Sequence, residues 1–121
     1  MPKVLIVDDH EYLRKLVREF LEIQSGYDVC GEAVDGYDAI QKAQELKPDV
    51  IILDMSMPRM NGIEAATRLK KLLPQTPIVL FTSHGPFGGF DPRAAGIDAV
   101  VAKDGGMSSL LDSLQGLLQG V

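Results

Sequence analysis

The sequence predicts a single α/β domain with a parallel five-stranded sheet and helices on both faces. Short apolar runs of strand length alternate with segments whose apolar residues recur at helical spacing. Alternation of this kind produces parallel strands joined by right-handed helical crossovers. The chain has 121 residues, 45% of them hydrophobic, which suits one compact domain with one core. We therefore treat residues 1–121 as one domain.

The expected strands are aliphatic runs bounded by turn-forming residues. The central one, Val50–Leu53, has four consecutive aliphatic residues, as in a strand buried on both faces. The second run is less apolar, and we expect it at a sheet edge. In chain order the expected strands cover residues 2–7, 28–33, 50–53, 77–83 and 97–102. For a chain of this size we expect the flavodoxin-like strand order 2-1-3-4-5.

Helices are expected between the strands and after the last one. Gly26 would end the first helix in the left-handed conformation, Asp38 would cap the second, and Ser109 with Asp112 would cap the last. The inward-facing residues are expected to be Leu13, Leu16, Val17, Phe20 and Leu21; Ala39, Ile40, Ala43 and Leu46; Ile63, Ala66, Leu69, Leu72 and Leu73; and Leu110, Leu111, Leu114, Leu117 and Leu118.

The segment between the fourth and fifth strands differs from the other crossovers. Residues 84–92 hold several glycines and two prolines, which oppose a regular helix. We therefore predict that the fourth helix is short or irregular.

Composition excludes several classes of function. The net charge is −5 and no basic cluster occurs, which argues against direct binding of nucleic acid. The single Cys30 rules out an internal disulfide and fits a reducing compartment. No apolar run reaches membrane length and no signal peptide is evident, so we expect a cytoplasmic protein with no membrane partner.

Acidic side chains follow two strands that the expected order makes neighbours. Asp8 and Asp9 come after the first strand, and Asp54 comes after the third. In such sheets ligands bind outside the carboxyl ends of the strands, at the point where the strand order reverses. Three close carboxylates repel one another unless a cation neutralises them, and Mg²⁺ prefers oxygen ligands of this kind. The sequence therefore predicts a Mg²⁺ site with room for a phosphoryl group.

Two further strands contribute a hydroxyl and a cation to the same edge. The fourth ends at Thr82 and the fifth at Lys103. A hydroxyl can donate to one phosphoryl oxygen while an ammonium pairs with another. An aspartate can itself be the nucleophile and form an acyl phosphate. This combination predicts phosphoryl chemistry at an aspartate.

Four segments, residues 5–10, 53–62, 81–83 and 101–103, carry a family resemblance that extends over the whole chain. The sequence resembles the receiver domain of two-component response regulators. The resemblance implies that Asp54 accepts a phosphoryl group from a histidine kinase or phosphotransfer protein and that the domain then changes conformation. It implies that Asp9, Asp54 and the Ser56 carbonyl bind Mg²⁺ directly and that Asp8 acts through water. Thr82 would be the switch hydroxyl and Lys103 the phosphoryl contact.

The resemblance also suggests how the signal is timed and passed on. Ser56 and His84 each lie two residues after a site residue, where they would influence the lifetime of the phosphoryl group; a plain surface position is the other interpretation of His84. Residues 8–10, 31–33 and 103–104 are similar to receivers that precede a helix-turn-helix DNA-binding domain. No output domain is present in this chain, so either a stand-alone receiver with a downstream protein partner or a truncated protein is expected. A homodimer formed through the last helix and strands is also compatible with this resemblance.

Three features depart from the family pattern. Val100 replaces an aromatic residue, Asp104 replaces a proline, and residues 85–92 replace the usual fourth helix. We therefore expect residues 84–96 to be mobile or irregular and the output mechanism to be unusual or weak.

Three other functions were weighed. An aspartyl-phosphate phosphohydrolase needs an acid where Ser56 stands, and a flavin-binding module needs a phosphate-cradling loop where Asp8 and Asp9 would repel a phosphate. A degenerate receiver that only binds partners is the third. We expect no enzyme beyond Mg²⁺-dependent self-phosphorylation and autodephosphorylation.

Overall fold

Five parallel strands form one sheet in the order β2-β1-β3-β4-β5, which confirms the predicted topology. The structure is a computed structural model and describes residues 1–23, 26–83 and 91–119. The strands are β1 (Lys3–Val7), β2 (Asp28–Ala33), β3 (Val50–Leu53), β4 (Ile78–Thr82) and β5 (Ala99–Ala102). The α-helices are α1 (Glu11–Ile23), α2 (Gly36–Leu46), α3 (Gly62–Leu72) and α4 (Met107–Gln119), with 3₁₀ turns η1 (Pro92–Ala95) and η2 (Lys103–Gly105).

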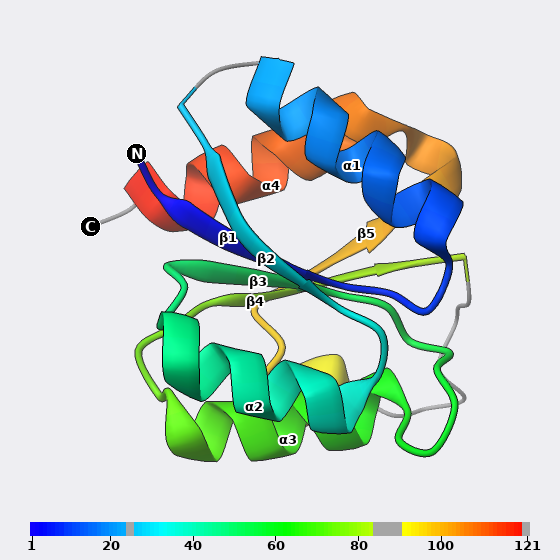
Figure 1. Ribbon diagram of the computed structural model, residues 1–121, viewed down its shortest axis with the longest axis vertical. Helices are drawn as coiled ribbons and strands as arrows, with labels where there is room; N and C mark the ends of the chain where they lie inside the picture. Colours follow the sequence, from blue (N-terminus) through cyan, green and yellow to red (C-terminus); the bar gives the residue numbers. More distant parts are fainter. Residues whose placement is uncertain (24–25, 84–90, 120–121) are drawn as a thin grey trace.

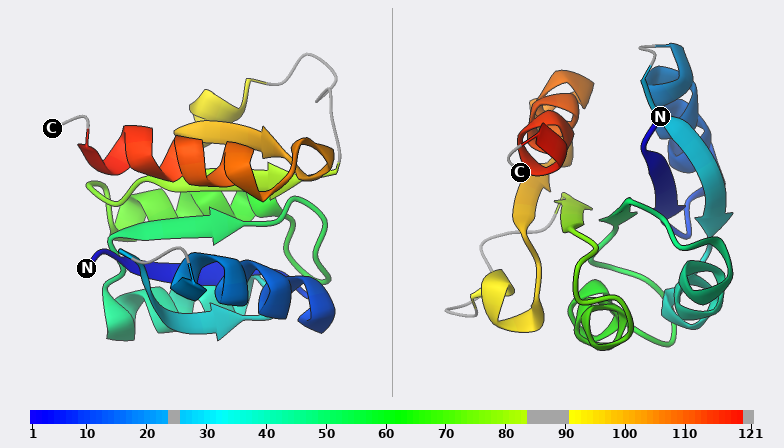
Figure 2. Two further views of the ribbon diagram at one scale, coloured as in Figure 1. Left: turned by 90° about the horizontal axis from the view of Figure 1, so that it is seen from above. Right: turned by 90° about the vertical axis from the view of Figure 1, so that its left-hand side faces the viewer.

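Helices cover both faces of the sheet, as predicted. In Figures 1 and 2, α1 and α4 lie on one face while α2 and α3 lie on the other. Successive strand residues point to opposite faces, so each strand serves both cores. In β1, for example, Leu5 and Val7 pack with α2 and α3, whereas Val4 and Ile6 pack with α1 and α4.

The register of the central strands places their carboxyl ends together. Val7 of β1 pairs with Leu53 of β3 and with Ala33 of β2. The backbone N–H of Asp54 donates to the Val7 carbonyl at 2.9 Å, and that of Asp8 donates to the Ala33 carbonyl at 3.0 Å. The ladder therefore continues up to the two acidic residues and holds their backbones in place.

Four local predictions about the helices were wrong. Leu16 was predicted to face inward but is 38% exposed, because Val17 and Leu21 take the buried positions of α1. Asp35, not Asp38, caps α2, because its carboxylate accepts a hydrogen bond from the Asp38 N–H at 2.8 Å. Leu72 is 41% exposed, because Leu73, four residues after the buried Leu69, packs against the core in its place. Ser109 lies inside the first turn of α4, where its hydroxyl donates to the Gly105 carbonyl, so it does not cap the helix.

The crossover from β4 to β5 contains only the 3₁₀ turn η1 in its described part, residues 83 and 91–98. This agrees with the prediction of a short fourth helix. Residues 84–90, and with them His84, lie outside the described residues. The fifth strand begins at Ala99, two residues later than predicted, because the Ile97 N–H turns back to the Pro92 carbonyl. Gly26 has a φ of +88°, the left-handed conformation predicted for it.

Among the described residues, none of the helices has the length and apolar character needed to cross a membrane.

Candidate functional site

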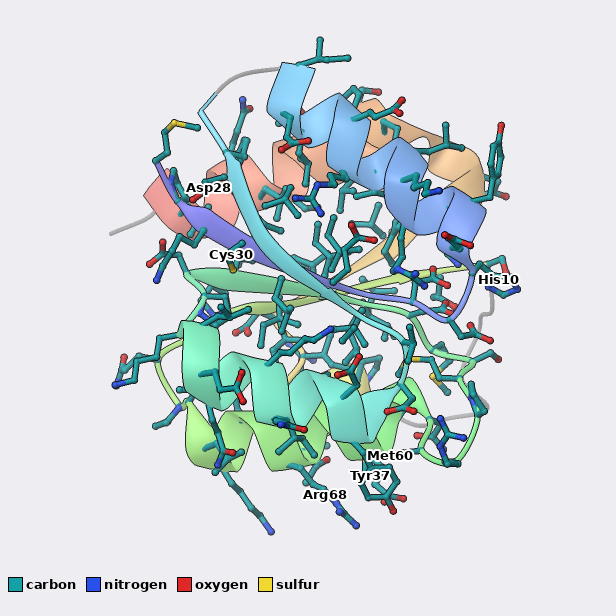
Figure 3. The ribbon with its side chains drawn as sticks, viewed as in Figure 1. His10, Asp28, Cys30, Tyr37, Met60 and Arg68 are labelled. Atoms are coloured by element: carbon teal, nitrogen blue, oxygen red, sulfur yellow. The ribbon has the colours of Figure 1, made fainter. Side chains whose placement is uncertain are left out.

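The predicted site residues come from four strands and meet at one edge of the sheet. Asp8 and Asp9 follow β1, Asp54 follows β3, Thr82 is the last residue of β4, and Lys103 follows β5. Figure 3 shows His10 at this edge, just before α1, whereas Asp28 at the start of β2 lies at the opposite edge. The parallel arrangement therefore brings residues up to 95 positions apart into contact, as in the Lys103–Asp8 hydrogen bond.

Lys103 joins the carboxylates that follow β1 and β3. Its ammonium nitrogen lies 3.1 Å from Asp8 Oδ2 and 3.2 Å from Asp54 Oδ1. The side chains of Asp8 and Asp54 are only 7% and 4% exposed. Buried charges require partners, so this cation makes the approach of two carboxylates tolerable.

The surroundings of Asp54 disfavour its ionised form. Burial raises the pKa of its carboxyl group, the nearby charge of Asp8 raises it further, and Lys103 opposes both effects. The ionised form of Asp54 is therefore less favoured here than it is in water, even with the Lys103 ammonium beside it. Any added positive charge at this edge would stabilise it.

His10 joins the acidic cluster, which the sequence analysis did not predict. Its backbone N–H donates to Asp8 Oδ1 at 2.9 Å. Its ring Nδ1 lies 3.1 Å from the same oxygen and 3.2 Å from Asp9 Oδ1. The only sequence signal was its position directly after the two aspartates, and a loop residue can turn its side chain either way.

The cluster suits a divalent cation. One ligand atom from each of Asp8, Asp9, His10 and Asp54 lies within 4.8 Å of the others. Three carboxylates and one ammonium leave two uncompensated negative charges, which matches one dication. Ser56 is exposed in the adjoining hollow, whose walls are Asp9, His10, Met55, Ser56, Met57, Pro58 and Asn61.

The loop after Asp54 is held against the start of α2. Met60 is buried and packs on Gly36, where a Cβ would come within 2.5 Å of its sulfur. The Arg59 guanidinium pairs with the buried carboxylate of Asp35, and Arg59 itself has a left-handed backbone with a φ of 69°. A backbone hydrogen bond closes the same loop, because the Gly62 N–H donates to the Met55 carbonyl at 2.7 Å. These contacts fix the backbone that carries Ser56.

The remaining predicted positions lie on the β4–β5 side. Thr82 is buried and pairs in register with Ala102. Val100 is 46% exposed on β5, and Asp104 is exposed in η2.

On the opposite side of the site, Arg14 donates to the Asp8 carbonyl at 2.6 Å and to Glu32 at 3.0 Å, which links α1 and β2 to the acidic loop. Sequence reasoning missed Arg14, because α1 also carries Lys15 and Arg18, and the sequence does not say which of these basic side chains turns toward the acidic loop.

Comparison with known proteins gives one family. The family model described as "Response regulator receiver domain" matches residues 4–115. The response regulator protein VraR of Staphylococcus epidermidis is 39% identical over 122 residues, covering 98% of this chain and 57% of the relative. VraR of Staphylococcus saprophyticus is 40% identical over 114 residues, covering 93% of this chain and 54% of the relative. The chain thus spans little more than half the length of these curated relatives.

Solved structures agree with this family. A LuxR-family two-component response regulator from Aurantimonas sp. SI85-9A1 superposes with a TM-score of 0.93 at 28% identity, covering 99% of this chain and 86% of the other. Chemotaxis protein CheY4 of Vibrio cholerae gives 0.87 at 34% identity, covering 97% and 98%. Response regulator TrrA of Thermotoga maritima, solved in complex with Mg²⁺-BeF, gives 0.87 at 29% identity, covering 97% and 99%.

Proposed function

The chain belongs to the response regulator receiver domains, the phosphoacceptor domains of two-component signalling, and we propose that Asp54 is the residue that accepts the phosphoryl group. The observation that carries this assignment is the Lys103 ammonium, which lies within 3.2 Å of both Asp54 and Asp8 at the carboxyl edge of the sheet. Of the three acids, Asp54 combines this cation with a position directly after the central strand β3 and deep burial.

The chemistry needs few groups beyond these. An oxygen of Asp54 attacks the phosphorus of a phosphohistidine, the P–O bond forms, and the P–N bond breaks as the imidazole leaves with the bonding electrons and takes up a proton. Phosphoryl transfer depends mainly on alignment and on neutralising the phosphoryl oxygens. The Lys103 ammonium would pair with one of those oxygens and the Thr82 hydroxyl would donate to another.

Mg²⁺ is the proposed cofactor. Asp9, Asp54 and the backbone carbonyl of Ser56 would hold it directly, with Asp8 acting through water. The two uncompensated negative charges of the cluster support a dication, and oxygen donors are the ligands that Mg²⁺ prefers. When bound, Mg²⁺ supplies positive charge to the phosphoryl oxygens.

Receiver domains are signalling switches and not classical enzymes, so the output is a conformational change read by partners. We propose a histidine kinase or phosphotransfer protein as the donor. A DNA-binding output domain, as the name of one neighbour, a DNA-binding response regulator of the LuxR family from Staphylococcus aureus, suggests, or a separate protein would read the change, with homodimerisation as a further route. Self-phosphorylation from small donors and autodephosphorylation would be the only activities of the domain itself. Ser56 and His84 would adjust its phosphoryl lifetime, and the single cysteine fits a location in the cytoplasm.

Intact mass spectrometry tests the assignment. The wild-type chain, incubated with Mg²⁺ and acetyl phosphate, should gain one phosphoryl group, and Asp54→Asn should gain none. Asp112→Asn is the matched control, because Asp112 is exposed on α4 and the same change removes a carboxylate outside the site. Circular dichroism checks that all three are folded. A phosphoryl group on folded Asp54→Asn, or none on the wild type, would contradict the proposal.

A further inference from the structure

We propose that the ion pair between Arg59 and Asp35 positions the Ser56 carbonyl for the metal, which makes both members of the pair positioning residues of the phosphoacceptor site. The inference rests on the proposed function, which assigns the Ser56 carbonyl to Mg²⁺. It adds two residues that lie outside the acidic cluster. It starts from the loop between β3 and α3, residues 54–61.

The backbone of Arg59 has a conformation that a side chain opposes. Its φ is 69°, and the Met60 N–H donates to the Pro58 carbonyl at 2.7 Å, which closes a three-residue turn around Arg59. This turn with a positive φ is the strained form, and glycine adopts a positive φ at no steric cost. Arginine at this position therefore needs a compensating contact, and its side chain provides one.

The compensating contact is with a carboxylate that is already held in place. The Arg59 guanidinium pairs with Oδ2 of Asp35, while Oδ1 of Asp35 accepts the Asp38 N–H at 2.8 Å at the start of α2. The Asp35 side chain is only 7% exposed, whereas that of Arg59 is 64% exposed. The carboxylate is thus a fixed point inside the protein, and the arginine attaches the loop to it from the surface.

Other contacts hold the two ends of the loop. The Gly62 N–H donates to the Met55 carbonyl at 2.7 Å, which closes the loop at its base. Met60 is buried against Gly36, and Figure 3 shows Met60 and Tyr37 at this corner, where α2 begins. The ends of the loop are therefore fixed by backbone and core contacts that do not involve the guanidinium.

The middle of the loop is the part that the ion pair holds. Residues 56–58 are exposed or half-buried and line the hollow next to the acidic cluster. Arg59 directly follows them, so its contact with Asp35 fixes the end of this wall. Without the ion pair, the Ser56 carbonyl would take several positions relative to the carboxylates.

Mg²⁺ binding is sensitive to such a displacement. Mg²⁺ requires near-octahedral geometry with oxygen ligands about 2.0–2.1 Å away. Groups that support a ligand without touching the metal change metal affinity about 10–100-fold when they are removed. We therefore expect loss of the ion pair to weaken Mg²⁺ binding by at least about tenfold.

The test measures the Mg²⁺ dissociation constant by isothermal titration calorimetry in the wild type and in variants of the ion pair. Arg59→Gly removes the guanidinium and lets the turn form without strain, whereas Asp35→Asn removes the charge and keeps the α2 cap. Each should raise the dissociation constant at least about tenfold, and the double variant should raise it no further than the larger single effect, because both changes remove the same contact. Arg59→Lys, which keeps the charge, should restore part of the affinity.

Arg93→Gly is the matched control, because it removes an exposed ion pair with Asp91, which caps η1 outside the loop. Its Mg²⁺ dissociation constant should equal that of the wild type. Two further measurements separate positioning from stability. In EDTA, Arg59→Gly should unfold in urea with a free energy close to that of the wild type, while its Ser56 amide should exchange hydrogen faster. Phosphorylation of Arg59→Gly by acetyl phosphate should be slow at low Mg²⁺ and recover at saturating Mg²⁺.

Three results would overturn the inference: a folded Arg59→Gly or Asp35→Asn with the wild-type dissociation constant, single effects that multiply in the double variant, or a phosphorylation defect that saturating Mg²⁺ does not relieve. If the wild type is phosphorylated at Asp54 and the dissociation constant does not change in the variants, the proposed function stands and the positioning role falls. If Mg²⁺ binding weakens as expected and the wild type is not phosphorylated, the proposed function falls and the positioning of the metal ligand stands.

Discussion

A side chain at Gly62 should destabilise the domain, because the first residue of α3 lies directly against the backbone of the proposed phosphoacceptor. A Cβ at Gly62 would stand 2.3 Å from the Asp54 carbonyl oxygen and 2.9 Å from the Met55 Cα. Contacts under 3.0 Å essentially do not occur, so the two backbones would have to separate by roughly 0.7 Å. Neither obstacle is a flexible side chain that can turn away. Gly62→Ala therefore has to displace the strand end that carries Asp54.

The expected loss follows from two opposing effects. Overpacking costs about 1–3 kcal/mol, and the upper end applies here because both contacts are with backbone. The greater helix preference of alanine offsets about 1 kcal/mol at most. The net loss in the free energy of unfolding is then about 2 kcal/mol, or about 8 °C in melting temperature for a domain of this size.

Gly116→Ala is the matched control, since nothing lies within 4 Å of its added Cβ in α4. It should raise the free energy of unfolding by up to about 1 kcal/mol. Thermal and urea unfolding followed by circular dichroism measure both variants. Gly62→Ala should also accept phosphoryl groups more slowly. A Gly62→Ala protein as stable as the wild type would refute the packing argument.

Three further predictions concern charge. Asp54→Asn should raise the free energy of unfolding at pH 7 in EDTA, because burial raises the pKa of this carboxyl group above its usual 3.8 and ionised Asp54 therefore destabilises the fold as pH rises through that raised pKa. Urea unfolding at several pH values should show that the stability difference between Asp54→Asn and the wild type vanishes below about pH 3.8. Saturating Mg²⁺ should stabilise the wild type by about 1.4 kcal/mol at ten times its dissociation constant, and calorimetry should show a smaller shift for Asp9→Asn. Asp35→Ala should lose about 1 kcal/mol through the α2 cap, whereas Asp35→Asn should keep the cap. Because Arg59 lowers the pKa of Asp35, the stability that this ion pair contributes should persist above pH 3.8 and fade only as pH falls below it, which unfolding of Asp35→Asn against wild type measures.

The strand order and the acidic edge were predictable because they depend on long-range regularities. Aliphatic runs such as Val50–Leu53 have one compatible role in a small α/β domain, and parallel strands bring their carboxyl ends together whatever the loops do. Asp8, Asp54 and Lys103 could therefore be grouped from their positions after strands alone. The contacts of Lys103 with both acids agree with that reasoning.

Local choices were less predictable because several residues satisfied the same rule. Asp35 and Asp38 are both good capping residues, and the close packing of Gly36 on Met60 favours the earlier start of α2. Tertiary contacts that involve long side chains, such as the pairing of Arg59 with Asp35, leave no periodic signal in the sequence. The position of the His10 ring among the carboxylates is of the same kind, since it depends on side-chain rotation in a loop.

The most direct test of the account is to locate the acyl phosphate itself. The wild type is phosphorylated with acetyl phosphate and Mg²⁺, reduced with borohydride so that an aspartyl phosphate becomes homoserine, and digested for tandem mass spectrometry. The account predicts homoserine at residue 54, in the peptide that also contains Ser56, with Asp8 and Asp9 unmodified. Homoserine at Asp8 or Asp9, or none in the chain, would contradict the assignment of Asp54 as the phosphoacceptor.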